Sequence, residues 1–150
     1  MNRLITLMSL FLICFFPLAK ADIAMSDIVM SDIVVVTNKD NPIKTLTKKQ
    51  IIDIYMGRRS TYPNGQPVIA IDQKTDGLTR KLFYKHLVNK TVSEINAYWA
   101  RLLFSGRAMP PKTAENIASI VEMLKNNKSA IAYMNLDDLT DDIVVLTYVN

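Results

Sequence analysis

The fold of this chain is decided by residues 67–88, which read P-V-I-A-I-D-Q-K-T-D-G-L-T-R-K-L-F-Y-K-H-L-V. A short apolar run at residues 68–71 ends at Asp72 and is followed by a polar stretch, residues 73–77, which predicts a strand and then a turn. Apolar residues then recur at helical spacing, which predicts a helix directly after the turn: Leu78, Leu82, Phe83 and Leu87.

The first backbone amides of this predicted helix are the most suggestive functional feature. They have no partner inside the helix and lie at the positive end of its dipole. We expect an oxyanion to be held there by the amides around Asp76, Gly77 and Leu78, and by the amide and hydroxyl of Thr79. The alternative is that the side chain of Asp76 or Thr75 caps the helix by accepting hydrogen bonds from these amides, which then do not bind an anion.

Residues 1–21, M-N-R-L-I-T-L-M-S-L-F-L-I-C-F-F-P-L-A-K-A, are typical of a secretory signal peptide. A positive charge precedes a long apolar run, and Ala19-Lys20-Ala21 provides a small-x-small cleavage site. An uncleaved membrane anchor is the alternative, but the apolar run is shorter than the roughly 20 residues of a span. We therefore expect a periplasmic protein, without membrane attachment after cleavage, whose residues 22–31 form a flexible leader.

Composition limits what the remaining chain can be. Cleavage removes two positive charges, Arg3 and Lys20, which halves the net charge of +4 and leaves no reason to expect a nucleic-acid partner. Roughly 130 residues suffice for one domain. The single cysteine, Cys14, lies in the signal peptide, so the exported domain has no disulfide. With one histidine, His86, we expect no metal site and no cofactor.

The rest of the chain alternates between strand and helix patterns. Two capping boxes mark helix starts, Thr47 with Gln50 and Thr91 with Glu94. The helix that begins at Thr91 has an apolar stripe that includes Trp99 and Leu103, and a fourth helix is predicted at residues 113–126. The predicted strands are residues 32–37, 68–71, 130–134 and 143–149. This order predicts an α/β layered sandwich with a mainly parallel central sheet, spanning residues 32–150 as a single domain.

Residues 34–59, V-V-V-T-N-K-D-N-P-I-K-T-L-T-K-K-Q-I-I-D-I-Y-M-G-R-R, resemble the phosphate-transport substrate-binding proteins. In that family a strand, an N-P loop, L-T-x-x-Q and I-F-x-G-x follow one another in this order. The likeness continues through P-V-I-A-I-D-Q, Y-W-A-R-L-L-F-S-G-R and K-S-A-I-A-Y-M. It implies one lobe of a type 2 periplasmic binding protein and an oxyanion ligand such as inorganic phosphate, in a transport or sensing system.

The chain departs from this family at the expected anion loop. The family's lobe has R-x-D-G-S-G-T, and an ungapped alignment on Phe83 places residues 73–79, Q-K-T-D-G-L-T, against it. Only Thr79 is retained, whereas a shift of one residue matches Asp76 and Gly77 but displaces the threonine. An amide cradle tolerates either alignment, because every residue here except proline supplies a backbone N–H.

The resemblance also implies a half-site, since family members enclose the anion between two lobes. An open half-site competes with water, so we expect weak binding unless a second copy of the chain or another protein closes over it. Lys74, Arg80 and Arg107 are the cations expected near its mouth. The alternative for each is a solvated surface charge.

Two functions remain open on the sequence alone. The first is an oxyanion-binding protein, and the second is an interaction module that has lost its ligand and docks on a sensor kinase or an envelope partner. We do not expect an enzyme, because no serine or cysteine is placed by a motif to pair with His86. The acidic residues at positions 137–142 lack the glycine and terminal glutamate of a calcium-binding loop.

Overall fold

The computed structural model describes residues 32–74 and 77–149. The predicted signal peptide and leader, residues 1–31, therefore lie outside the described residues, as do Thr75 and Asp76. None of the helices in the described part is long and apolar enough to cross a membrane.

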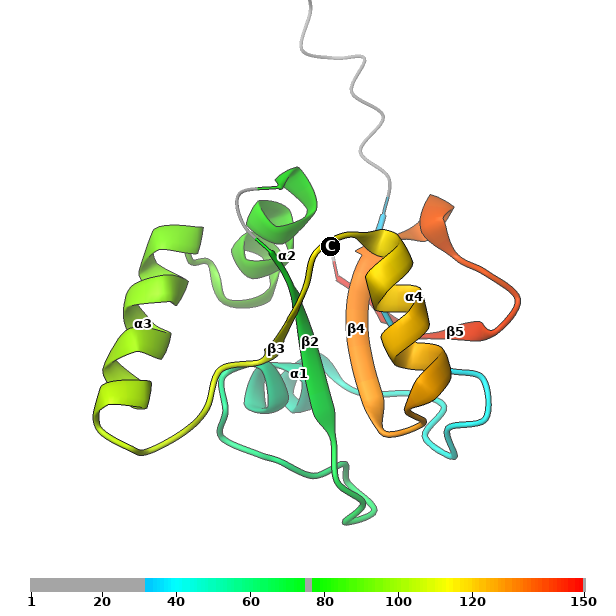
Figure 1. The fold of residues 1–150 in the computed structure, drawn as a ribbon, viewed down its shortest axis with the longest axis horizontal. Helices are drawn as coiled ribbons and strands as arrows, with labels where there is room; N and C mark the ends of the chain where they lie inside the picture. Colours follow the sequence, from blue (N-terminus) through cyan, green and yellow to red (C-terminus); the bar gives the residue numbers. More distant parts are fainter. Residues whose placement is uncertain (1–31, 75–76, 150) are drawn as a thin grey trace, which may run out of the picture.

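The described residues form an α/β structure around a five-stranded sheet with the order β3-β2-β4-β1-β5 (Figure 1). β2 pairs in parallel with β3 and β4, whereas β1 is antiparallel to both β4 and β5. The sheet is thus mainly parallel, as predicted, with β1 alone reversed among the described strands. The strands are β1 (Ile33–Asn38), β2 (Ile69–Gln73), β3 (Lys112–Ala114), β4 (Ala130–Asn135) and β5 (Ile143–Tyr148).

β1 is buried on both faces because it lies between β4 and β5 and under helices on either side. Its side chains alternate between two apolar clusters: Ile33 and Val35 belong to one, Val34 and Val36 to the other. The strand predicted at residues 32–37 is confirmed, and its continuous β-branched run, residues 33–36, suits burial on both faces.

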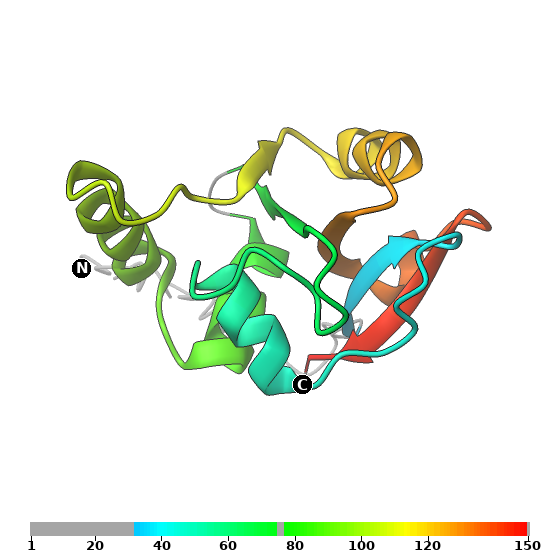
Figure 2. The ribbon, with the colours of Figure 1, turned by 90° about the horizontal axis from the view of Figure 1, so that it is seen from below.

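The helices form a layer on each side of the sheet. α1 (Lys48–Tyr55), α2 (Leu78–Val88) and α3 (Val92–Phe104) lie on one side, and α4 (Ile117–Asn126) covers the other (Figures 1 and 2). A short 3-10 helix, η2 (Leu136–Asp138), connects β4 to β5. The layered sandwich expected from the sequence is therefore confirmed.

Four aromatic side chains fix α2 against the sheet. The Phe83 ring stacks on Tyr133 of β4, with 3.7 Å between centroids and 4° between planes. Tyr55 of α1 meets Phe83 edge-on at 4.9 Å, and Tyr84 meets it at 5.1 Å. All four rings are fully buried. Because the Phe83 ring of α2 lies between Tyr55 of α1 and Tyr133 of β4, it sets the depth at which α2 packs.

The two predicted capping boxes are confirmed. Thr47 with Gln50 and Thr91 with Glu94 both form complete capping boxes. Gly57, two residues after the end of α1, has a φ of +66°, and a Cβ there would lie 2.6 Å from Cη2 of Trp99. Glycine is required at this position by both its backbone conformation and the indole packed against it.

Two predictions about the second half of the chain are wrong. The helix expected at residues 113–126 begins only at Ile117, because Lys112–Ala114 pair with β2 as a strand and Asn116 caps α4 through Ser119 N. Leu103, expected in the apolar stripe of α3, is 44% exposed. It lies near the end of α3, which stands to one side of the sheet (Figure 1).

Phe83→Ala should lower the free energy of unfolding by about 3–5 kcal/mol, because it removes a ring that stacks between a helix and a strand. The matched control is Phe104→Ala, since Phe104 is 90% exposed, and we expect a change within about 0.5 kcal/mol. Urea unfolding followed by circular dichroism measures both. Similar losses for the two variants would contradict the assigned core.

Candidate functional site

The carboxyl ends of the parallel strands β2, β3 and β4 meet at one edge of the sheet, and α2 begins there (Figure 1). Gln73 lies opposite Ala114, and the Lys74 N–H donates to the Ala114 carbonyl at 2.8 Å. The Gln73 side chain donates to the Tyr133 carbonyl at 3.0 Å. Ligands of open α/β sheets bind outside this edge, so it is the candidate site.

The start of α2 presents backbone amides at this edge. Gly77 is the N-cap residue, with an extended backbone and no side chain to cap the first turn. Gly77 is exposed, and the next residue, Leu78, is 56% exposed. The Thr79 hydroxyl donates to Asn135 Oδ1, at the end of β4, over a long 3.4 Å. An anion at this edge would meet the positive end of the helix dipole.

A buried carboxylate lies directly behind this helix start. Asp72 is 5% exposed and accepts hydrogen bonds from the hydroxyls of Tyr84 at 3.0 Å and Tyr133 at 2.5 Å. The Gln73 N–H donates to the same carboxylate at 2.8 Å. Arg80 donates from Nε to both Asp72 carboxylate oxygens at 3.1–3.2 Å and from Nη2 to Asp72 Oδ2 at 3.0 Å. This number of donors compensates for the loss of water around a buried charge.

Arg80 is not the solvated surface charge considered in the sequence analysis, because it is buried with only 7% of its surface exposed. Besides Asp72, its Nη2 donates to Asn96 of α3 at 3.0 Å, and the guanidinium lies 5.5 Å from the Tyr84 ring centroid. Burial lowers the pKa of Arg80, but the hydrogen bonds and charge of Asp72 outweigh burial, so the pKa is raised. Arg80 therefore ties the first turns of α2 to β2 and α3.

The other predicted site residues fall in two places. Lys74 follows β2 at the carboxyl edge, the edge at which Gly77, Leu78 and Thr79 also lie. Its Nζ lies 2.6 Å from Oε2 of Glu115. Arg107 instead lines a cleft beside the first residues of β2. The five residues of β2 span about 16 Å, so the structure does not bring Arg107 to the start of α2. Asp76 lies outside the described residues.

Asn135 is the residue at this edge that the sequence analysis missed. It is the last residue of β4 and contacts Thr79. A polar residue that ends an apolar strand of a parallel sheet commonly faces a ligand site. The pattern A-I-A-Y-M-N therefore predicts that Asn135 lies at the candidate site. Within residues 32–74 and 77–149, no three His, Cys, Asp or Glu side chains are grouped to hold a metal ion.

A model of the family described as PBP superfamily domain matches residues 18–148 of the chain. No curated protein matches. Among solved structures, a candidate phosphate ABC transporter substrate-binding protein from Clostridium perfringens, with bound phosphate, is similar with a TM-score of 0.62 and 20% identity, covering 78% of this chain and 44% of that chain.

An ABC-type phosphate transport receptor from Vibrio cholerae is similar with a TM-score of 0.62 and 13% identity, covering 78% of this chain and 46% of that one. PstS from Borrelia burgdorferi is similar with a TM-score of 0.59 and 12% identity, covering 78% of this chain and 47% of that chain. The chain thus spans less than half the length of these structures. At such identities they show the fold alone.

Arg80→Met should lower the free energy of unfolding by about 3–5 kcal/mol, because it leaves the Asp72 carboxylate buried without its ionic partner. The double variant Asp72→Asn/Arg80→Met should lose less than the sum of the two single variants, since it removes both charges. A double-mutant cycle by urea unfolding measures the coupling. Additive losses would show that the pair does not interact as described.

Stability should fall steeply above about pH 10, where unfolded tyrosines ionise. Burial, followed by the nearby Asp72 charge, raises the pKa of Tyr133 well above its ordinary value. Below pH 10 the ring is protonated in both states, so it contributes no pH dependence; above pH 10 only the unfolded state loses the proton. Each such tyrosine costs about 1.4 kcal/mol per pH unit. Above pH 10 the free energy of unfolding of Tyr133→Phe should fall less steeply with pH than that of the wild type. Urea unfolding at a series of pH values measures this slope, and an unchanged slope contradicts the prediction.

Proposed function

The chain belongs to the PBP superfamily domain family, and we propose that it binds phosphate or a similar inorganic oxyanion at the start of α2. The observation that carries this proposal is the exposed start of α2, with glycine as its N-cap, at the carboxyl edge of parallel strands. The fold is one shared with a structure solved with bound phosphate. We infer a binding protein rather than an enzyme.

The proposed chemistry relies on neutral donors. The amides of Leu78 and Thr79 would donate to the anion, and the Thr79 hydroxyl would exchange its long bond to Asn135 for a shorter one to an anion oxygen. Lys74 supplies positive charge nearby, although it is shared with Glu115. Because Arg80 is engaged by Asp72, we expect the helix start to provide more of the attraction than any side-chain cation.

We propose that this edge is half of a clamp. An oxyanion on an open surface keeps much of its water and is held by few fixed donors, so affinity should be in the millimolar range or weaker. A second copy of the chain or a different protein would strengthen binding by closing over the anion. We place the protein outside the cytoplasm, where it would serve a transport or sensing system.

A second candidate function is an interaction module without a ligand. Two observations favour it: the guanidinium of Arg80 is turned to Asp72 inside the protein, and Leu78 exposes an apolar side chain at the start of α2. Such a surface would suit a partner protein, for example the outer domain of a sensor kinase or an envelope protein. The two functions differ in whether an inorganic anion stabilises the isolated chain.

Titration with inorganic phosphate and with sulfate should raise the melting temperature of the isolated chain. For a dissociation constant near 5 mM, phosphate at 50 mM adds about 1.4 kcal/mol to the free energy of unfolding. A constant ionic strength, kept with chloride, removes general salt effects. The absence of any shift at tens of millimolar of either anion would rule out the binding proposal and favour the interaction module.

Variants at the helix start should locate the bound anion. Leu78→Pro removes one amide N–H at the first helical position, which proline tolerates because Gly77 is already extended. Its matched control is Leu78→Ala, which keeps the amide. We expect Leu78→Pro and Thr79→Val to weaken phosphate binding about 3- to 10-fold, and Leu78→Ala and Arg58→Ala to leave it unchanged. Equal losses in Leu78→Pro and Leu78→Ala would place the anion elsewhere.

A further inference from the structure

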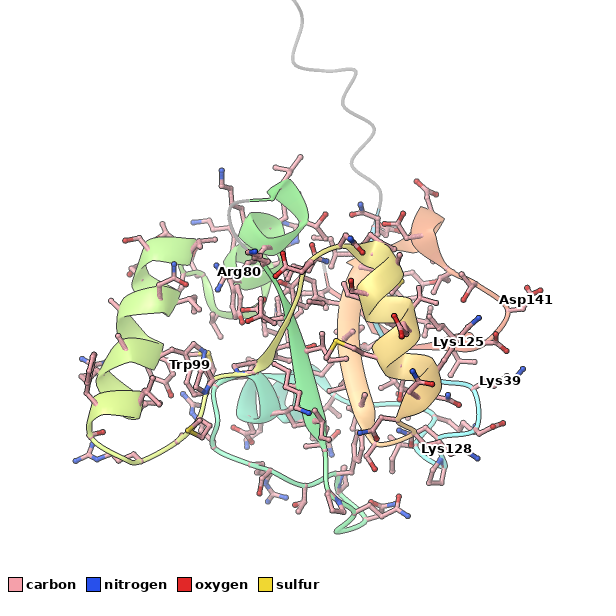
Figure 3. The ribbon with its side chains drawn as sticks, viewed as in Figure 1. Lys39, Arg80, Trp99, Lys125, Lys128 and Asp141 are labelled. Carbon is pink, nitrogen blue, oxygen red and sulfur yellow. The ribbon has the colours of Figure 1, made fainter. Side chains whose placement is uncertain are left out.

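A basic cleft lies at the opposite edge of the sheet from the start of α2. It has a volume of about 430 Å³ and is enclosed by the end of α1, the first residues of β2, and the loop between α3 and β3. Trp99 lies between α3 and this loop (Figure 3) and lines the cleft. The cleft therefore does not belong to the candidate oxyanion site.

The positive charge of this cleft is only partly neutralised. Four cationic side chains line it, Arg58, Arg59, Arg107 and Lys112, and no aspartate or glutamate does. Arg58 lies 3.5 Å from Asp53, but the other three cations form no ion pair with any described residue. All three are exposed. An anion entering the cleft would meet no competing carboxylate in its lining.

The remaining lining is largely apolar. Three of the apolar residues come from different elements, Ile54 from α1, Ala70 from β2 and Trp99 from α3. Val68 precedes β2, and the loop adds Ala108, Met109, Pro110 and Pro111. Trp99 is 6% exposed, whereas Met109 is 75% exposed at the margin. A concave apolar surface of a few hundred Å³ with a few convergent charged groups has the character of a small-molecule site.

We propose that this cleft binds an organic anion, a carboxylate attached to an apolar body. The guanidinium groups of Arg59 and Arg107 match the planar carboxylate, and Lys112 adds a third positive charge. The apolar body would pack against the Trp99 ring and the prolines of the loop. An inorganic ion fits the charges but leaves the apolar surface uncovered, so the cleft favours ligands with both parts.

Trp99 is the only tryptophan in the sequence, so its fluorescence reports on this cleft directly. Cyclohexanecarboxylate should change Trp99 emission saturably, with a dissociation constant near 1 mM. Cyclohexanecarboxamide, which keeps the apolar body without the charge, should bind at least 5-fold more weakly. Inorganic phosphate at the same ionic strength should leave the emission unchanged.

Arg107→Gln should weaken cyclohexanecarboxylate binding about 5- to 10-fold. The matched control is Lys48→Gln, which removes the same charge from an exposed position at the start of α1, away from the cleft. Circular dichroism establishes that both variants fold. No saturable change up to 20 mM, equal binding of the carboxamide, or equal losses in both variants would overturn the proposal. Leu78→Pro, which tests the oxyanion site, should leave this titration unchanged, so either proposal can fail alone.

Discussion

The buried ion pair between Asp72 and Arg80 is the interaction on which the arrangement of the site depends. Asp72 ends the apolar part of β2, Arg80 lies in the first turn of α2, and Tyr133 comes from β4. A carboxylate taken out of water is costly unless donors replace that water, and here two hydroxyls, an amide and a guanidinium do so. Satisfying this one charge therefore requires β2, β4 and α2 to meet in a single geometry.

This requirement also determines what remains for a ligand. The positive charge of Arg80 is used within the protein, so the surface in front of it depends on amides and the helix dipole. Amides cannot be removed by most substitutions, so the proposed anion site at the start of α2 does not require the loop, Q-K-T-D-G-L-T, to match R-x-D-G-S-G-T. The orientation of α2 depends instead on Phe83, which stacks on Tyr133, and on Arg80, which pairs with Asp72.

The features predictable from the sequence are those whose causes are local or strongly periodic. Thr47 with Gln50 and Thr91 with Glu94 form their caps within four residues, and the run in β1 needs only burial on two faces. The three residues of β3 carry no period, and only their pairing with β2 makes them a strand. The Asp72–Arg80 pair joins residues eight positions apart, one on β2 and one on α2. Arg107 follows α3 in the loop that lines the cleft, so neither position follows from spacing.

The two proposed sites lie at opposite ends of β2 and would use different anion chemistry. At the carboxyl edge the attraction would come from oriented amides, which suit a small, strongly hydrated oxyanion only if another surface helps to exclude water. At the amino edge it would come from exposed cations around an apolar floor, where the body of the ligand itself would displace water from Trp99 and its neighbours. The two edges would therefore select by different parts of a ligand: the first by the geometry of its oxygens, the second by the hydrophobic surface attached to its charge.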